Sequence, residues 1–409
     1  MNAPLAPAPQ PARIQADLDT LAEFRDPEKP GWTRRAFGEY GVAGRKWIAE
    51  RMRDAGLDVR TDPAGNIIGT LPGEGPALVT GSHTDTVESG GRFDGIIGVL
   101  AGIEVARLFT ESGVRPRHEF RVVDFFNEEP NPYGLSCVGS RAIGGVLTPE
   151  QLDLTDPDGE TLRDGLTRVG ADPDGALRCA WSADEVLAYV ELHIEQGPLL
   201  ERHGVPLAVV TAIAGIHRAV ITVDGQADHA GTTPMDLRHD ALCAAAETVT
   251  AIERLAAGGV ATVGRIESQP GAANVVPERA RLWVEFRGPD AGWLDARHAL
   301  LESAAAEAAR TRGCTVTVEW VSAVAPVPVP DRMQDTIAAA IDRLGHRQER
   351  MFSGAGHDAA HIAPLAPMGM IFVPSRDGRS HCPEEFTETG QVATGAHALA
   401  QTLLDLDTP

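Results

Sequence analysis

The chain has 409 residues, with 36 lysine and arginine residues against 58 aspartate and glutamate residues, and its formal net charge is −22. Its 43% hydrophobic residues suffice to bury the cores of two or three domains, so a mainly disordered chain is excluded. The acidic balance leaves no basic surface for phosphate groups, which argues against binding to nucleic acids or to anionic membranes.

The cysteines and the first residues bear on the cellular compartment. Five cysteines are present, an odd number without any C-x-x-C pair. We therefore expect neither a disulfide framework nor a thiolate zinc site, and a reducing cytoplasm. Residues 1–13 are rich in alanine and proline and lack the pattern of a signal peptide, so we predict a disordered tail over residues 1–14. The longest apolar stretch, residues 96–109, is interrupted by Glu104 and Arg107 and cannot span a bilayer.

Helix and strand patterns alternate in the first part of the chain. Apolar side chains with helical spacing predict helices over residues 42–56 and from Ile96 to Gly113. Short strands are predicted at residues 57–60, 66–70, 77–82 and 119–126. This alternation is typical of an α/β domain with a mostly parallel sheet.

The pattern changes at about residue 213. Before it, a loop-rich excursion over residues 148–183 leads to an alternating strand at residues 189–195, with His193 on the polar face. After it, strands and alanine-rich helices over residues 219–320 follow the order β-α-β-β-α-β. That order indicates a self-contained α+β unit.

One domain is therefore predicted to interrupt another. A helix at residues 333–344 and a strand at residues 368–373 resume the first pattern. We expect a catalytic domain built from residues 15–212 and 327–409. Residues 213–326 form the inserted α+β domain.

Hard metal ligands follow the predicted strands of the catalytic domain. They are His83 and Asp85 after one strand, Asp94 before a helix, Glu128 and Glu129 after the strand that ends at Phe126, and His381 after the strand at residues 368–373. Taken singly each is ordinary, since a lone aspartate before a helix is usually an N-cap. Together, imidazole and carboxylate groups at the strand ends of an open α/β sheet predict a paired divalent-metal site.

The ligands divide between two cations. Asp94 can bridge cations about 3.5–4 Å apart, with His83 on one and with Glu129 and His381 on the other. The first cation then lacks a second protein ligand of its own. His193, on the polar face of its strand, can supply it.

The adjacent glutamates can divide the chemistry. If Glu129 ligates a cation, Glu128 is free to act as the general base toward the attacking water and to pass the proton to the leaving nitrogen. Asp85 would orient His83 through the second ring nitrogen of the imidazole.

These residues resemble the hydantoinase/carbamoylase amidases of the M20 metallopeptidase superfamily, which include N-carbamoyl-L-amino-acid hydrolases, β-ureidopropionases and allantoate amidohydrolases. The matching segments are, in order, GSHTDTV, GRFDGIIGVL, FNEEP with GSRA, ELHIEQGP, DGQADHAGTTPM, GAANVVP, SGAGHDAA and MIFVPSRDGRSHCPEE. The resemblance runs from about Trp32 to the C-terminus. His193 is the informative position, because peptidase branches of the superfamily typically place a carboxylate there and the ureido-cleaving branch uses histidine.

The resemblance implies a di-metal catalytic domain and a lid domain that also forms a homodimer. It implies that His229 stabilises the substrate oxyanion, often in the site of the partner subunit. Asn274 and Arg287 would hold the substrate, with the planar fork of Arg287 on an α-carboxylate. Gln196 and Gly356 would complete the substrate pocket. On the residues alone, Arg287 would be a surface arginine and Asn274 a turn residue.

A second pair of histidines offers a rival metal site. His357 and His361 are four residues apart and on a helix would share one face like a zinc clamp. We favour a packing role for His361, because it precedes an apolar stretch and because this segment lines the site of related amidases without ligating metal. Residues 130–137 and 216–218 depart from the family pattern, which leaves the side chain of the substrate open.

The sequence therefore predicts a cytoplasmic, homodimeric amidohydrolase with two divalent cations per subunit, taken from Mn²⁺, Zn²⁺, Co²⁺ and Ni²⁺. It would cleave the ureido C–N bond of an N-carbamoyl-L-amino acid to the amino acid, ammonia and carbon dioxide. The alternatives are an allantoate or β-ureido acid amidohydrolase, an N-acyl-amino-acid deacylase, and a metal-free binder of amino-acid derivatives. The expected partner is thus a small ureido acid.

Overall fold

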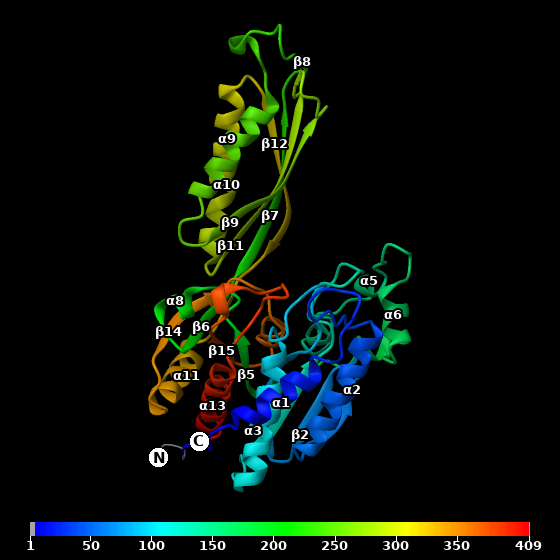
Figure 1. Cartoon of the computed structure of the whole chain (residues 1–409), viewed down its shortest axis with the longest axis vertical. Coiled ribbons are helices and arrows are strands. Elements are labelled where there is room, and N and C mark those ends of the chain that lie inside the picture. Colours follow the sequence, from blue (N-terminus) through cyan, green and yellow to red (C-terminus); the bar gives the residue numbers. More distant parts are fainter. Residues whose placement is uncertain (1–4, 409) are drawn as a thin grey trace. The chain divides into compact units, whose positions relative to one another are not determined.

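The computed structural model describes residues 5–408, and the chain forms two compact units (Figure 1). The first unit contains the chain up to Thr211 together with Val329–Met351 and the residues from Ala355 onward. The second unit contains Ala212–Pro328 and Phe352–Gly354. The inserted domain expected from the sequence, residues 213–326, differs from the second unit by one residue at its start and two at its end, apart from the short return at residues 352–354.

A mixed sheet forms the framework of the first unit. Its strands follow the order β1-β2-β4-β3-β5-β15-β6, with β14 also on β6 and with β13 paired to Ala212 and Ile213 at the end of β6. The bounds are β1 (Asp58–Thr61), β2 (Ile67–Leu71), β3 (Glu74–His83), β4 (His118–Phe125), β5 (Val186–Ile194), β6 (Leu207–Ile213), β13 (Val327–Pro328), β14 (Gln348–Ser353) and β15 (Met368–Val373). The central strands β4, β3, β5 and β15 are parallel, whereas the pairs β1/β2, β2/β4 and β15/β6 are antiparallel. The predicted mostly parallel centre is confirmed.

Helices pack on this sheet and connect its strands. They are α1 (Pro11–Leu21), α2 (Glu39–Asp54), α3 (Ile96–Ser112), α4 (Val138–Ile143), α5 (Pro149–Leu152), α6 (Leu162–Arg168), α7 (Pro173–Ala176), α8 (Leu199–His203), α11 (Asp331–Arg343), α12 (Ala359–Ile362) and α13 (Thr389–Leu406), with 3₁₀ turns η1 (Ala183–Glu185) and η3 (Arg376–Gly378). Helix α3 is buried from Ile96 to Phe109. It approaches the sheet closely at Gly98, where a Cβ would lie 2.5 Å from the carbonyl oxygen of Leu192. Gly113 ends α3 in the left-handed conformation, as its sequence position predicts.

The N-terminal segment differs from its prediction. Residues 11–14, which were expected to belong to a disordered tail, form the first turn of α1, with Ile14 buried. The backbone N–H of Ala6 donates to the side chain of Gln401 at 2.9 Å, and Arg13 pairs with the fully buried Glu104 at 2.7 Å. These contacts join residues far apart in the sequence, so composition alone misses them. Residues 1–4 of the predicted tail lie outside the described residues.

The second unit combines an antiparallel sheet with two long helices. Its elements are β7 (Gly215–Asp224), β8 (Asp228–His229), η2 (Met235–Leu237), α9 (Ala241–Arg254), β9 (Val260–Gln269), β10 (Val275–Val276), β11 (Arg279–Gly288), α10 (Ala291–Thr311) and β12 (Thr315–Val324). The strands form an antiparallel sheet in the order β12-β7-β11-β9, with α9 and α10 along one face of it (Figure 1). Alternate residues of the strands, such as Ile221 and Leu282, are fully buried beneath these helices.

Two further expectations concern the thiols and the membrane. All five cysteines lie within the described residues, and all five are free thiols. Between residues 5 and 408 no helix combines the length and the apolar character that crossing a bilayer requires.

Candidate functional site

The predicted ligands meet at one edge of the parallel sheet of the first unit. Strand β3 ends at His83, β4 is followed by Asn127–Glu129, β5 carries His193 near its end, and the loop after β15 leads to His381. Because these strands are parallel, their carboxyl ends lie at the same edge. This is where open α/β sheets place their sites.

A first group of ligand atoms comes from His83, Asp94 and His193, all buried and within 4.8 Å of one another. Asp94 Oδ1 lies 3.1 Å from His193 Nε2. In both imidazoles the Nδ1–H donates to a backbone carbonyl at 3.0 Å, that of Asp85 for His83 and that of Ile194 for His193. The Nε2 atoms therefore present their lone pairs to the shared space, as metal-ligating histidines do.

A second group comes from Asp94, Glu129 and His381. His381 Nε2 lies 3.0 Å from Asp94 Oδ2 and 3.5 Å from Glu129 Oε1. The imidazole of His381 is half exposed, whereas the two carboxylates are buried. Asp94 thus belongs to both groups and presents a different oxygen to His193 and to His381.

The backbone leaves room for this convergence at Gly95. This residue has a φ of 68°, and a Cβ on it would lie 2.2 Å from Nε2 of His83. Its N–H donates to Nε2 of His193 at 3.2 Å. Glycine is therefore required between Asp94 and helix α3 both for the left-handed conformation and for space.

The electrostatics of the site suit divalent cations. Burial and the neighbouring Asp94 raise the pKa of Glu129 to about 7, and burial raises the pKa of Glu128 well above its ordinary value. Burial also raises the pKa of Asp94, but the neighbouring imidazoles of His193 and His381 hold it well below the usual range. A bound cation compensates such a concentration of buried carboxylates. Imidazole and carboxylate ligands together suit several first-row metals.

Glu128 lies beside the first group and belongs to neither ligand set. Its Oε2 is 3.6 Å from Nε2 of His83. The thiol of Cys137, a residue with a φ of 57°, donates to Oε1 of Glu128 at 3.6 Å. Glu128 is therefore a buried carboxylate held next to the predicted metal ligands, a position that a general base would need.

Asp85 supports the site in a way that the sequence did not predict. We expected its carboxylate to orient His83, but that carboxylate is 3.6 Å from Nδ1, and the backbone carbonyl of Asp85 accepts the hydrogen bond instead. The carboxylate accepts from the backbone N–H of Glu128 at 3.2 Å and of Glu129 at 3.3 Å. The backbone carbonyl of Asp85 therefore orients the imidazole of His83, while its carboxylate fixes the backbone of the two glutamates.

Glu385 is a supporting residue that the sequence analysis missed. Its Oε1 accepts from the backbone N–H groups of Phe93 at 2.9 Å and Asp94 at 3.1 Å. Its Oε2 accepts from Ser380 Oγ at 2.8 Å and from the backbone N–H of His381 at 3.3 Å. One buried carboxylate thus ties together the two loops that carry Asp94 and His381. The only signal in the sequence is its place in the run His-Cys-Pro-Glu-Glu.

The predicted substrate-binding residues fall in both units. In the first unit, Gln196 has a φ of 58° and donates from Nε2 to Asp94 Oδ2 at 2.8 Å, so it contacts a predicted metal ligand. Gly356 lies in the loop before α12, and a Cβ there would meet no atom within 4 Å. Open space beside this backbone is compatible with a substrate pocket.

The remaining predicted substrate residues belong to the second unit. His229 pairs with Val275 across β8 and β10, and the N–H of Ala230 donates to the carbonyl of Asn274 at 3.0 Å, so His229 and Asn274 are neighbours. Arg287, near the end of β11, donates to Glu285 Oε1 at 2.5 Å and to the carbonyl of Gly354 at 2.8 Å. Its guanidinium is therefore oriented before any ligand arrives.

The rival histidine pair does not form a helical clamp. His357 precedes α12, so that it does not share a helix face with His361. Its ring packs edge-on against His193 with centroids 4.5 Å apart, and its nitrogen groups with Glu191 and His193. His361 is largely buried, and burial followed by the charge of Arg141 lowers its pKa to about 4. The burial of His361 is that of a side chain packed in the protein interior.

Comparisons with known proteins identify the family of the chain. Residues 79–405 match the family described as Peptidase family M20/M25/M40. The chain is 39% identical to an N-carbamoyl-L-amino acid amidohydrolase of Geobacillus stearothermophilus, over 97% of this chain and 98% of that protein. It is 34% identical to a ureidoglycolate hydrolase of Arabidopsis thaliana, over 96% of this chain and 86% of that protein. Among solved structures, a hydantoinase/carbamoylase family amidase from Burkholderia multivorans superposes with a TM-score of 0.92 at 35% identity, covering 98% of this chain and 99% of that one.

The hydrogen bonds of Glu385 generate a prediction for metal affinity. In Glu385→Gln, one side-chain oxygen becomes an NH₂ group that cannot accept from Ser380 and His381. We expect metal affinity to fall about 10- to 100-fold, as for other residues that orient metal ligands. Competition with a chromogenic chelator measures the affinity, and a melting curve checks that the variant is folded.

The neighbouring Glu384 provides the matched control, because it is exposed and pairs with Arg379 on the surface. Glu384→Gln should keep the affinity of the parent protein. Equal affinities of the two variants would show that Glu385 does not position the ligands.

His361 generates a prediction for stability at acidic pH. Its folded pKa of about 4 lies below the value of about 6.5 expected in the unfolded chain. Between these values the unfolded chain binds more protons, so the free energy of unfolding decreases as pH falls, by up to about 3 kcal/mol from this group. His361→Phe should remove this part of the acid sensitivity, measured by urea unfolding at pH 8 and pH 4.5. The exposed His203 provides the control, because His203→Gln should lose as much stability between pH 8 and pH 4.5 as the parent protein does. If His361→Phe loses just as much over this pH range as His203→Gln, the assignment is contradicted.

Proposed function

Because the chain belongs to the Peptidase family M20/M25/M40, we propose that it hydrolyses the terminal C–N bond of the ureido group of an N-carbamoyl-L-amino acid. The products would be the free amino acid, ammonia and carbon dioxide. The observation that carries the proposal is the pair of ligand groups that share Asp94, with Glu128 held beside them and outside both. The similarity to the N-carbamoyl-L-amino acid amidohydrolase of Geobacillus stearothermophilus, which extends over nearly the whole length of both proteins, supports the ureido substrate.

The ligand groups assign the residues that would hold cations. His83, Asp94 and His193 would bind one, and Asp94, Glu129 and His381 would bind the other. Divalent cations held there would polarise the carbamoyl oxygen and lower the pKa of the attacking water. Mn²⁺, Zn²⁺, Co²⁺ and Ni²⁺ all accept imidazole and carboxylate ligands.

Glu128 would move the protons of the reaction. Its carboxylate accepts a proton from the water as the water oxygen attacks the carbamoyl carbon, and then delivers it to the terminal nitrogen as the C–N bond breaks. Ammonia leaves, and the remaining carbamate loses carbon dioxide to give the amino acid. The raised pKa of Glu128 suits both halves of this transfer.

Residues of both units would hold the substrate. His229 would donate to the developing oxyanion, either in its own subunit or in the partner of a homodimer formed through the second unit. Arg287 would grip the α-carboxylate, and its bond to Glu285 keeps its guanidinium in a fixed orientation. Asn274, Gln196 and Gly356 would complete the pocket.

A second candidate function is hydrolysis of an allantoate- or ureidoglycolate-type substrate. The similarity to the Arabidopsis ureidoglycolate hydrolase favours it, since that match also covers nearly the whole chain. The unusual segments at residues 130–137 and 216–218 leave the substrate side chain open. A β-ureido acid hydrolase and an N-acyl-amino-acid deacylase use the same chemistry and differ in the group that they accept.

A substrate panel separates these functions. With Mn²⁺-loaded protein we expect kcat/KM for N-carbamoyl-L-amino acids to exceed that for the N-acetyl derivatives, allantoate, ureidoglycolate and a β-ureido acid by at least about tenfold. The acetyl derivatives lack the terminal ureido nitrogen that the site would pair, and the other ureido compounds place their carboxylate differently relative to the ureido group. Release of ammonia and of free amino acid is measured for each compound. Equal or faster turnover of the acetyl compound would identify a deacylase.

The role of Glu128 has its own test. Glu128→Gln keeps the size of the side chain but cannot accept the proton, so kcat should fall by about 10²- to 10⁴-fold. Metal content, measured by elemental analysis, should stay at the level of the parent protein because Glu128 is outside both ligand groups. Glu253→Gln on the exposed face of α9 is the control. Near-normal turnover of Glu128→Gln would refute its role as the general base.

A further inference from the structure

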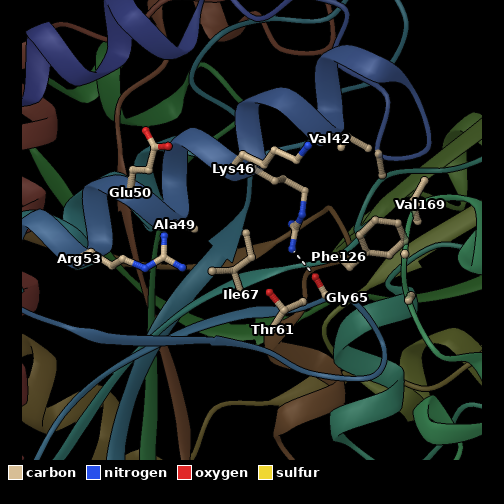
Figure 2. Close-up of a pocket in the computed structure, with 14 residues that line it drawn as sticks. Val42, Lys46, Ala49, Glu50, Arg53, Thr61, Gly65, Ile67, Phe126 and Val169 are labelled. Atoms are coloured by element: carbon tan, nitrogen blue, oxygen red, sulfur yellow. Dashed lines mark hydrogen bonds between the residues drawn. The ribbon is translucent and has the colours of Figure 1, made fainter.

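A cavity of about 370 Å³ lies beside helix α2 in the first unit (Figure 2). Its volume falls in the range of pockets that hold small molecules. None of the residues that line it belongs to the two ligand groups. They are Ala36, Val42, Arg45, Lys46, Ala49, Glu50, Arg53, Thr61, Gly65, Ile67, Phe126, Val169, Gly170 and Ala171.

One face of α2 supplies six of the fourteen lining residues. Its lining residues, at positions 42, 45, 46, 49, 50 and 53, follow the three- and four-residue spacing of a single helical face. A different face, with Ile48 and Met52, is buried in the core. The helix therefore has a second, charged face, and Ala49 in the middle of that face leaves the space open.

The opposite wall of the cavity is apolar. Ile67 and Phe126 are 5% and 3% exposed, and Figure 2 shows Phe126 and Val169 together at one end of the cavity. Thr61 adds a hydroxyl at the rim. A ligand in this space would place apolar atoms on Ile67 and Phe126 and would face charged side chains on α2.

The charges on α2 favour an anion. Arg45 is already neutralised, because its guanidinium lies 2.8 Å from Asp124 Oδ2 and donates to the carbonyl of Gly65. Lys46, Glu50 and Arg53 form no ion pair with any residue between 5 and 408. Two positive charges and one negative charge remain, which leaves one positive charge for a ligand to match.

We propose that this cavity binds a small monocarboxylate with an apolar body, of the size of 4-methylpentanoate. Its carboxylate lies between Lys46 and Arg53, where charge-assisted hydrogen bonds hold it. Its branched body covers Ile67 and Phe126. The site is separate from the catalytic centre, and the proposal does not depend on the substrate of the enzyme.

The lysine content of the chain provides a direct test. Lys29 and Lys46 are its two lysines, all other basic side chains except histidine being arginine. Reductive methylation of the whole protein with ¹³C-formaldehyde keeps the charge of both and gives one NMR signal set for each. Lys46→Met assigns the signals, and Lys29, an exposed residue paired with Glu88, serves as the internal control.

Three probes separate charge from apolar contact. Titration with 4-methylpentanoate should shift the Lys46 signal to saturation and leave that of Lys29 unchanged. Acetate lacks the branched hydrocarbon body, and 4-methylpentan-1-ol lacks the charge. Each should bind about tenfold more weakly than 4-methylpentanoate. This factor corresponds to the loss of a few buried methylene groups for acetate and of one hydrogen bond to a charged group for the alcohol. In Ala49→Trp, which fills the cavity, the shift caused by 4-methylpentanoate should disappear.

Each contrary result would overturn the proposal. Equal shifts of Lys46 and Lys29 would indicate general ion pairing at the surface. Equal binding of acetate and 4-methylpentanoate, or of the alcohol and 4-methylpentanoate, would show that the cavity does not combine charge with apolar contact. A shift that persists unchanged in Ala49→Trp, with a melting curve like that of the parent protein, would place the ligand elsewhere.

Discussion

The shared carboxylate of Asp94 is the interaction on which the candidate site depends. One oxygen faces His193 and the other faces His381, so a single side chain joins two groups whose members are spread from residue 83 to residue 381. This requires the loop before α3 to stay fixed against both β5 and the loop after β15. Gly95 provides the space, and the parallel pairing of β5 with β15 provides the alignment.

Buried carboxylates hold the loops of this site through backbone hydrogen bonds. Asp85 accepts from the N–H groups of Glu128 and Glu129, and Glu385 accepts from those of Phe93, Asp94 and His381. A carboxylate can accept several such bonds at once and is a strong acceptor when ionised. Part of the acidic character of the chain therefore serves to fix irregular backbone, a role distinct from both metal binding and solubility.

The sequence predicts elements well where a local pattern decides them, and less well where distant contacts do. His193 could be placed because its strand alternates between polar and apolar residues, and β5 forms as expected. The alternation did not reveal that the polar face of β5 is buried too. Glu191 on that face is fully buried. That burial follows from the central position of β5 between β3 and β15, which no local pattern encodes.

The start of the chain and Glu385 show the same limit. The composition of residues 1–14 resembles a tail, yet the hydrogen bond between Ala6 and Gln401 spans almost the whole sequence. Glu385 looks like one of two adjacent surface glutamates until the loop before α3 meets it. In both cases the deciding partner lies hundreds of residues away, so the role appears only in the folded chain.

The backbone of the site also has a consequence for the evolution of the protein. Among the non-glycine residues with positive φ in the described part of the chain are Asn127, Cys137, Gln196 and His381, all at or next to the site. Side chains in this conformation each cost about 1 kcal/mol of conformational energy that glycine would not. Selection for heat resistance alone would therefore favour glycine at these positions and remove the groups that surround Asp94. At these few residues, a substitution that raises the thermal stability of the fold would also remove a side chain of the candidate site.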